Sequence, residues 1–467
     1  MKWLRYVGIA FTFLFVLLVV ASIAFPYMLR AKVNSQIAEI KAKGEPVSTA
    51  DLAGPKIPDS ENAAVIYMQA FKLISSPEAE KEIGEASALL SQKKREENPE
   101  LWDKARQVVD RYHGALVLAE KAVSRPKCQF PVNWGDSPDK IARPHLSEIR
   151  KLTRLTAIQA LLDARAGKMD DAVRSIELGL KVSESLKSEP MIIGQIVRIA
   201  CLTIASGNLQ ECLHYGDLNE ALSKRLFLSF DSIELSDSIT SAMEDERAFG
   251  ISCFRVTREN PFSMTDASDS ILDNSNRKAS RNPRRPGAFW VSFTCADELF
   301  YLKTMDEYID RANLSYQEIK ARFPNIDNGP KMPRYALISS ILLPVFSKGG
   351  LKRDIEIAEI RGNQIMLALL AYKDRFGSYP RNLTELRTKL GWALKEDPFS
   401  GKDFIYRKRG RGFILYSIGE NLKDDGAKTV PSPIGPLVPD KENVLSSYPY
   451  QTPDGQKSAD KIWTMER

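Results

Sequence analysis

An uncharged and strongly apolar run extends from Tyr6 to Leu29, and it limits where the rest of the chain can fold. The run is long enough to cross a bilayer as one α-helix. Its apolar residues continue beyond Ser22–Ile23–Ala24, the small-residue site that a cleaved signal peptide would use, and this favours a retained signal anchor. We therefore expect residues 1–30 to be a transmembrane anchor. Basic residues close the run on both sides and leave its orientation open: Lys2 and Arg5 before it, Arg30 and Lys32 after it.

The composition limits the classes of partner and cofactor. The chain has 66 Lys and Arg against 60 Asp and Glu, a net charge of +6 over 467 residues, which does not suggest nucleic acid. A hydrophobic share of 43% is ordinary for a globular protein, and the length allows two to three domains. The cysteines are dispersed without a CxxC pair, and the histidines are far apart in sequence, so we expect neither a disulfide framework nor a zinc site.

The segment after the anchor predicts a tether followed by helices. GEPVSTADLAGPKIPDSE is rich in Pro, Gly and Ser, so residues 31–58 are expected to be a tether. Residues 59–250 are predicted to form a helical domain. Within it, LTRLTAIQALLDARAGKMDDAVRSIELGLKVSESL is typical of two helices joined at Gly167–Lys168. This hairpin is similar to a tetratricopeptide repeat, but no second copy follows at a fixed period, so an irregular helical domain is the alternative.

The sequence changes character over residues 251–290, where Ser, Asn, Asp, Pro and Arg dominate. We expect a flexible loop there, and a contact with anionic lipid or polymer is the functional alternative. Residues 291–350 are predicted to continue the helical domain. The basic residues of the loop are Arg277, Lys278, Arg281, Arg284 and Arg285.

Residues 351–430 predict a long helix, a short helix and a pair of strands. DIEIAEIRGNQIMLALLAYKDRFG has helical spacing and ends in Gly377, which fits the left-handed position that terminates a helix. Leu383 begins a short second helix after Pro380. EDPFSGKDFIYRKRGRGFILYSIGENLKDDG is typical of turn, strand, turn, strand and loop. Residues 431–467 are expected to be an irregular tail.

This order of elements resembles the C-terminal globular part of the major, G-type pseudopilin of type II secretion systems. The resemblance covers roughly the last quarter of the chain. The front of the chain looks like membrane-anchored proteins of planctomycete-type bacteria, a likeness that implies no activity. The residues that match the pseudopilin are Tyr372, Gly377, Tyr379, Pro380, Leu383, Leu386, Asp397–Pro398–Phe399–Ser400–Gly401, Tyr406, Phe413, Tyr416, Ser417, Gly419 and the acidic loop to Gly426.

The resemblance implies a topology but not assembly into a pilus. An exported domain and a short N-terminal tail place the bulk of the chain on the periplasmic side of a bacterial inner membrane. Pseudopilins carry a peptidase site after a glycine, then a phenylalanine and an early glutamate. Here Gly8 is followed by Ile9, and the apolar run contains no acidic residue. We therefore expect a protein that is not itself a pilus subunit.

The loop SIGENLKDDG is the one candidate metal site. Glu420, Asn421, Asp424 and Asp425 supply oxygen atoms of the kind that calcium prefers. The resemblance implies calcium in this loop, because pseudopilins bind the ion there. Lys423 intrudes into the pattern, and an ordinary Asx-rich turn is the alternative.

The sequence gives no positive sign of catalysis. It contains no GxSxG, Walker loop, HExxH or GxGxxG motif. Neighbouring acidic residues such as Glu244–Asp245–Glu246 are expected to be solvated surface groups. We predict a mainly α protein with a small C-terminal α+β domain, acting without catalysis as a membrane-anchored extracytoplasmic scaffold or interaction protein with partners in the cell envelope. The alternative is an exported envelope hydrolase or processing enzyme whose site leaves no motif.

Overall fold

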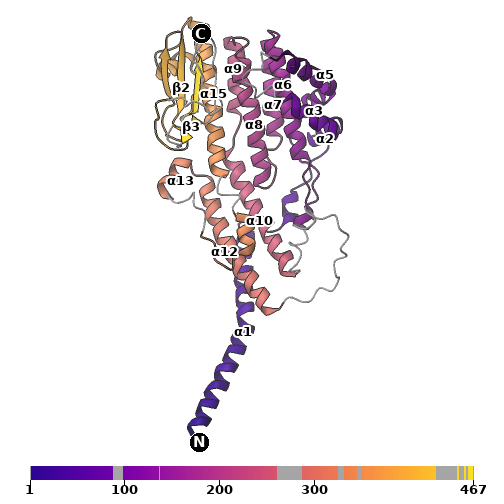
Figure 1. The fold of residues 1–467 in the computed structure, drawn as a ribbon, viewed down its shortest axis with the longest axis vertical. Coiled ribbons are helices and arrows are strands. Elements are labelled where there is room, and N and C mark those ends of the chain that lie inside the picture. The colour runs from indigo at the N-terminus through magenta and orange to yellow at the C-terminus, as the bar shows by residue number, and fades with distance from the viewer. Residues whose placement is uncertain are drawn as a thin grey trace.

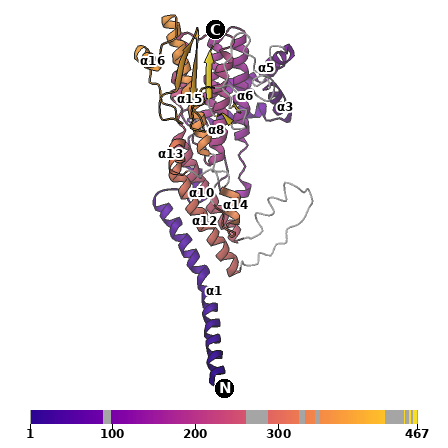
Figure 2. The ribbon, with the colours of Figure 1, turned by 60° about the vertical axis from the view of Figure 1, so that its left-hand side comes forward.

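The computed structural model shows a mainly helical protein with a small antiparallel sheet near the C-terminus and one long helix that projects from the body (Figures 1 and 2). The predicted combination of a mainly α chain with a small C-terminal α+β part is thereby confirmed. The structure describes residues 2–87, 98–135, 137–259, 287–323, 331–343, 349–427, 450–451, 457–458 and 461–465.

α1 (Lys2–Ala42) is one helix of 41 residues. Its first half stands clear of the body, and its second half runs alongside α12 (Ala288–Ala312) (Figure 1). Val33 and Ile40 are seven residues apart, so they lie on one face of the helix, and both are buried. The predicted tether over residues 31–58 is therefore wrong in its first part, because the Pro- and Gly-rich sequence starts only after the helix ends.

The rest of the predicted tether is held against the body. It contains the short 3-10 helix η1 (Thr49–Ala53). The backbone N–H of Thr49 donates to Ser252 Oγ at 2.9 Å. The side-chain amide of Gln129 donates to the backbone oxygen of Ala53 at 2.8 Å. These contacts fix the segment between α1 and the helical array.

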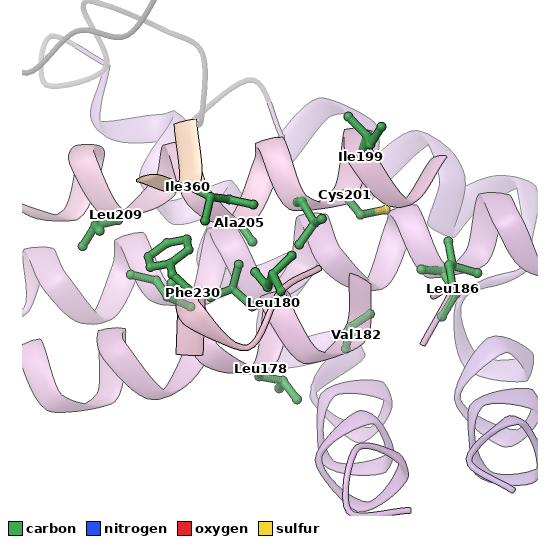
Figure 3. Close-up of a cluster of buried hydrophobic side chains, with 14 of the residues drawn as sticks. Leu178, Leu180, Val182, Leu186, Ile199, Cys201, Ala205, Leu209, Phe230 and Ile360 are labelled. Atoms are coloured by element: carbon green, nitrogen blue, oxygen red, sulfur yellow. The ribbon is translucent and has the colours of Figure 1, made fainter. Parts of the chain in front are cut away.

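The middle of the chain is an array of helices whose apolar faces share one core, part of which is drawn in Figure 3. α6 (His145–Arg165) and α7 (Met169–Glu184) form the predicted helix–turn–helix, and Gly167 in the turn has a left-handed φ of 76°. A Cβ added at Gly179 would lie 2.7 Å from Thr156 Oγ1, so glycine allows α7 to approach α6 closely. The other helices of the array are α2 (Ala64–Ile74), α3 (Pro77–Ala86), α5 (Pro99–Ala122), α8 (Ile192–Cys212), α9 (Glu220–Asp231) and α10 (Ser236–Glu259).

Within the part of the chain that the structure describes, α8 is the one helix that passes a test of length and apolar composition for crossing a membrane. Most of its apolar window is buried inside the protein. Figure 3 shows Ile199, Ala205 and Leu209 of this helix among the core side chains. The apolar character of α8 is therefore explained by its place in the core.

α10 and α12 pack on each other and extend the array towards α1 (Figure 1). α10 continues to Glu259 and α12 begins at Ala288, so the predicted loop over residues 251–290 is helical at both ends. Helical structure continues after α12 in α13 (Tyr316–Arg322) and α14 (Leu337–Leu342), as expected. Outside the described residues lie the basic side chains of that loop: Arg277, Lys278, Arg281, Arg284 and Arg285.

The C-terminal elements follow in the predicted order. The first helix ends before Gly377, whose φ is 75°. The second begins after Asn382, whose side-chain oxygen accepts the backbone N–H of Glu385 at 2.8 Å. The two strands pair in antiparallel register, with Tyr406 opposite Leu415. These elements are α15 (Gly349–Phe376), α16 (Leu383–Leu390), β1 (Ile405–Arg409) and β2 (Gly412–Ser417).

A third strand corrects the prediction of an irregular tail over residues 431–467. β5 (Lys461–Met465) pairs antiparallel with β2, so the order of the sheet is β1-β2-β5. Its Trp463 is fully buried, and the indole N–H donates to Asn363 Oδ1 of α15 at 3.0 Å. A Cβ added at Gly362 would lie 2.1 Å from the Trp463 ring, so the indole rests directly on the backbone of α15. Residues 431–449 lie outside the described residues.

α15 lies between the sheet and the helical array, with β2 and β5 on one side and α8 and α9 on the other (Figure 1). Between Ala358 and Tyr372 it is buried on nearly all sides, including the polar residues Glu359 and Asn363. Glu359 Oε1 accepts a hydrogen bond from Gln210 of α8 at 3.0 Å. The predicted domain boundary at residue 351 therefore does not separate two cores, because α15 belongs to both neighbours.

Candidate functional site

The predicted metal loop follows β2. Asp424 Oδ1 accepts two hydrogen bonds, from the Tyr416 hydroxyl at 2.9 Å and from the backbone N–H of Gly426 at 2.8 Å. The side-chain amide of Asn421 donates to Asp425 Oδ2 at 2.8 Å. Glu420 is half-buried at the start of the loop. The carboxylates are thus used by the loop itself.

The loop does not gather its acids around one point. In the described ranges, no group of three or more His, Cys, Asp and Glu side chains is arranged to hold a metal ion. Calcium binding by Glu420, Asn421, Asp424 and Asp425 therefore stays a prediction, which this arrangement of the acids does not support. The geometry is that of the Asx-rich turn, because Asp424 and Asn421 accept backbone N–H groups two residues further along.

Replacing Asp424 by Ala is expected to lower the free energy of unfolding by about 1–2 kcal/mol, because the buried Tyr416 hydroxyl loses its acceptor. Urea unfolding of the full chain in detergent measures the change. Lys423→Ala, at an exposed position of the same loop, is the control and should leave stability unchanged. Calcium and a chelator should give the same unfolding midpoint, and a midpoint raised by calcium would contradict this account of the loop.

A second polar group, which we call the α10 acid cluster, consists of Asp245, Glu246, Glu189, His145 and Arg143. Asp245 and Glu246 lie on α10, Glu189 lies between α7 and α8, and His145 begins α6. His145 and Glu189 are both buried and share a hydrogen bond of 2.9 Å between Nε2 and Oε1. Helices that are far apart in sequence thereby meet at one buried polar centre.

The cluster surrounds the N-terminal end of α8. Glu246 Oε2 accepts the backbone N–H of Ile192, the first residue of α8, at 3.2 Å. Met191 precedes it with a φ of 69°, in the left-handed region that residues with side chains rarely adopt. Arg143 Nη1 lies 2.9 Å from Met191 Sδ. The carboxylates of α10 therefore cap a helix whose start is strained, and the positive end of the α8 dipole favours negative charge there.

Burial changes the proton affinity of this centre. It raises the pKa of Glu246 to about 7, against the opposing effects of the Ile192 N–H and of Arg143. Burial likewise raises the pKa of Asp245 to about 6, and the Met191 N–H opposes the rise. At neutral pH the cluster thus exchanges protons. Glu246 and Asp245 accept the backbone N–H groups of Ile192 and Met191, and Glu189 pairs with His145, so the carboxyl groups already serve the contact between α10 and the start of α8.

The expectation that Glu244–Asp245–Glu246 is a solvated surface group is wrong for its last residue. Glu246 is 9% exposed because it continues the inner face of α10, which includes Ile239, Met243 and Gly250. This helical spacing is a signal that the sequence contains. The involvement of His145 has no such signal, because its partner Glu189 is 44 residues away.

Comparison of the chain with protein-family models, with curated proteins and with solved structures gives no match. The likeness of the C-terminal segment to a pseudopilin therefore stays a prediction, and function has to be argued from the residues.

Proposed function

We propose that the chain is a single-pass protein of the bacterial inner membrane whose helical body stands on the periplasmic side as a scaffold for envelope proteins, without being a pilus subunit. The observation that carries the proposal is the projecting half of α1. Its large apolar side chains meet solvent instead of protein, as at Phe11, Phe13 and Phe15, which are 71%, 69% and 66% exposed. Burying each such side chain in an apolar phase is worth about 1.5–3 kcal/mol. A bilayer supplies that phase.

The connection between the span and the body supports a fixed presentation. α1 continues from the apolar run to Ala42 as the same helix. Beyond it, the guanidinium of Arg247, which is 2% exposed, forms ion pairs with Glu45 and with Asp306 of α12. The helix rises about 18 Å over the twelve steps from Arg30 to Ala42. The body would therefore be held in a fixed position relative to the membrane.

The scaffold part of the proposal is supported by the position of the C-terminal unit. The sheet lies at the end of the body opposite the N-terminus of α1 (Figures 1 and 2). With α1 in the membrane, that end is the most accessible to other proteins. The α10 acid cluster is the one observation that favours the alternative of an exported enzyme. Its use in capping a helix makes the scaffold the better supported reading.

The topology is tested with spheroplasts that carry the full chain. Alkaline carbonate extraction should leave the chain in the membrane fraction, because α1 retains it. Protease added outside should degrade residues 31–467 and leave a short membrane-protected fragment. A cytoplasmic marker protein that stays intact is the control for sealed membranes.

The outcomes separate the two parts of the topology. Complete protection of the body in sealed spheroplasts would overturn the orientation. Extraction by carbonate, or a soluble form beginning near Phe25, would overturn the anchor.

A further inference from the structure

We propose that the body itself touches the bilayer, through an aromatic foot formed by Phe289, Trp290 and Phe293 at the N-terminal end of α12. The inference rests on the proposed membrane anchor and adds a second membrane contact to it. The contact would lie in the interface between headgroups and acyl chains, where aromatic side chains are favoured.

The position of the foot relative to the membrane follows from which residues of α1 and α12 lie side by side. The two helices pack along each other, and contacts at two levels show that they run in the same direction. At the upper level, Arg247 joins Glu45, just after α1, to Asp306 of α12. At the lower level, Arg30 is close enough to Cys295 for its positive charge to oppose the pKa rise that burial causes in the thiol. Ala42 at the end of α1 is twelve residues above Arg30, about 18 Å, and Asp306 is eleven residues above Cys295, about 17 Å, so Cys295 lies near the level of Arg30, the first charged residue after the apolar run.

The start of α12 then lies alongside the apolar run. Phe289 precedes Cys295 by six residues, which is about 9 Å along a helix. Pro26, four residues before Arg30, is buried, so α1 is still covered by protein below the level of Arg30. Amphipathic helices that lie on membranes bury their apolar face to about 5–10 Å, which matches the depth of the foot.

The chemistry of the foot suits an interface. Phe289 is 83% exposed, and its ring stacks on Phe293 with centroids 6.5 Å apart. Trp290 also stacks on Phe293, with ring centroids 5.9 Å apart, and its indole N–H donates to the backbone oxygen of Thr257 at 3.1 Å. The one polar atom of the three rings therefore has a protein partner. The rest of the ring surface is apolar: Phe289 is exposed, and Trp290 and Phe293 are half-buried.

α14 extends the apolar surface beside α12 (Figure 2). Its first turn is held by Asp297, which accepts the backbone N–H of Ile338 at 2.8 Å. Asp297 is two residues above Cys295, so this turn lies at the level of the predicted membrane boundary. Leu337 and Ile341 share one face of α14 and are 56% and 66% exposed. Exposed apolar side chains mark an interaction site, and at the level of the proposed membrane boundary the occupant that fits them is lipid.

The test places a nitroxide label at three positions of the full chain in lipid vesicles. Phe289→Cys reports the foot, Phe15→Cys reports the span, and Leu228→Cys on α9, at the far end of the body, is the matched control in water. The native thiols are protected, since Cys201, Cys212, Cys253 and Cys295 are buried, and Cys128→Ser is introduced in all three variants. Phe289 is exposed, so its replacement should leave the fold intact.

The proposal expects the label at 289 to be accessible to oxygen and shielded from a water-soluble nickel complex, at a shallower depth than the label at 15. The label at 228 should show the reverse. Nickel accessibility at 289 equal to that at 228, with the label at 15 in lipid, would overturn the foot while the anchor stands. Nickel accessibility at all three positions would overturn both. A label at 289 shielded from both reagents would mean that protein covers the surface, from a second copy or another chain, and would also overturn the foot.

Discussion

Replacement of Trp463 by Ala is expected to lower the free energy of unfolding by about 3–5 kcal/mol, the range for removing a large aromatic side chain from a core. Trp463 is fully buried between α15 and the sheet, packs edge-on against Phe404 and donates to Asn363. Its loss leaves a cavity and an amide oxygen without that donor. Urea unfolding of the full chain in detergent measures the change.

Two variants sharpen this result. Gly362→Ala should also destabilise, because its new Cβ would fall 2.1 Å from the Trp463 ring. Combining it with Trp463→Ala should cost less than the sum of the single changes, because the added methyl group occupies space that the indole leaves. Trp3→Ala, at a position 78% exposed, is the matched control. A Trp463→Ala variant as stable as the parent chain would show that β5 is not part of the core.

Replacement of Glu246 by Gln is expected to change how stability depends on pH by up to about 3 kcal/mol between pH 4.5 and 8. Burial raises the folded-state pKa of Glu246 to about 7 from an ordinary 4.5. A carboxyl with a raised pKa binds its proton more tightly when folded. Its contribution to stability is therefore complete below about pH 4.5 and is lost as the pH rises through 7. Gln keeps an oxygen for the Ile192 N–H but cannot ionise, so that part of the loss should disappear.

The measurement is urea unfolding at a series of pH values. The Glu246→Gln variant still contains Glu298, and burial also raises the pKa of that carboxyl to about 7. The variant should therefore lose only part of the pH dependence of the parent chain. Glu307→Gln, on the solvent side of α12, is the control and should retain the parent profile. A Glu246→Gln variant with the parent slope across this window would show that Glu246 does not titrate there.

The sequence predicts the elements whose ends are marked by glycine and proline residues nearby in the chain. The end of α15 is marked by Gly377, and the turn after it by Pro380. The turn between β1 and β2 is marked by Gly410. Each residue acts on its immediate neighbours in the chain. Such signals depend on backbone preferences alone, so they can be read without the fold. The order from α15 to β2 was predictable for this reason.

The rest depends on contacts between distant residues. β5 pairs with β2 across more than forty residues, and its short apolar alternation around Trp463 is too weak to identify alone. The burial of Glu246 depends on α8 arriving with free N–H groups at its start, which no local pattern of α10 reveals. In the predicted metal loop the competing contacts are local: hydrogen bonds from the Tyr416 hydroxyl and from the Gly426 N–H use an oxygen of Asp424 that composition alone offers to a cation.

α1 has a mechanical consequence. A helix of 41 residues is about 60 Å long and is much stiffer than a coil of the same sequence length. Its one internal proline, Pro26, removes a backbone hydrogen bond within the apolar run, near the lower end of the part that the body covers, so with α1 in the membrane as proposed, bending is easiest at that point. Above that point, any tilt of the helix becomes an equal rotation of the body. The sheet, farthest from this fulcrum, would then sweep the widest arc, so a change in lipid thickness would be converted into lateral movement of the surface that is offered to partners.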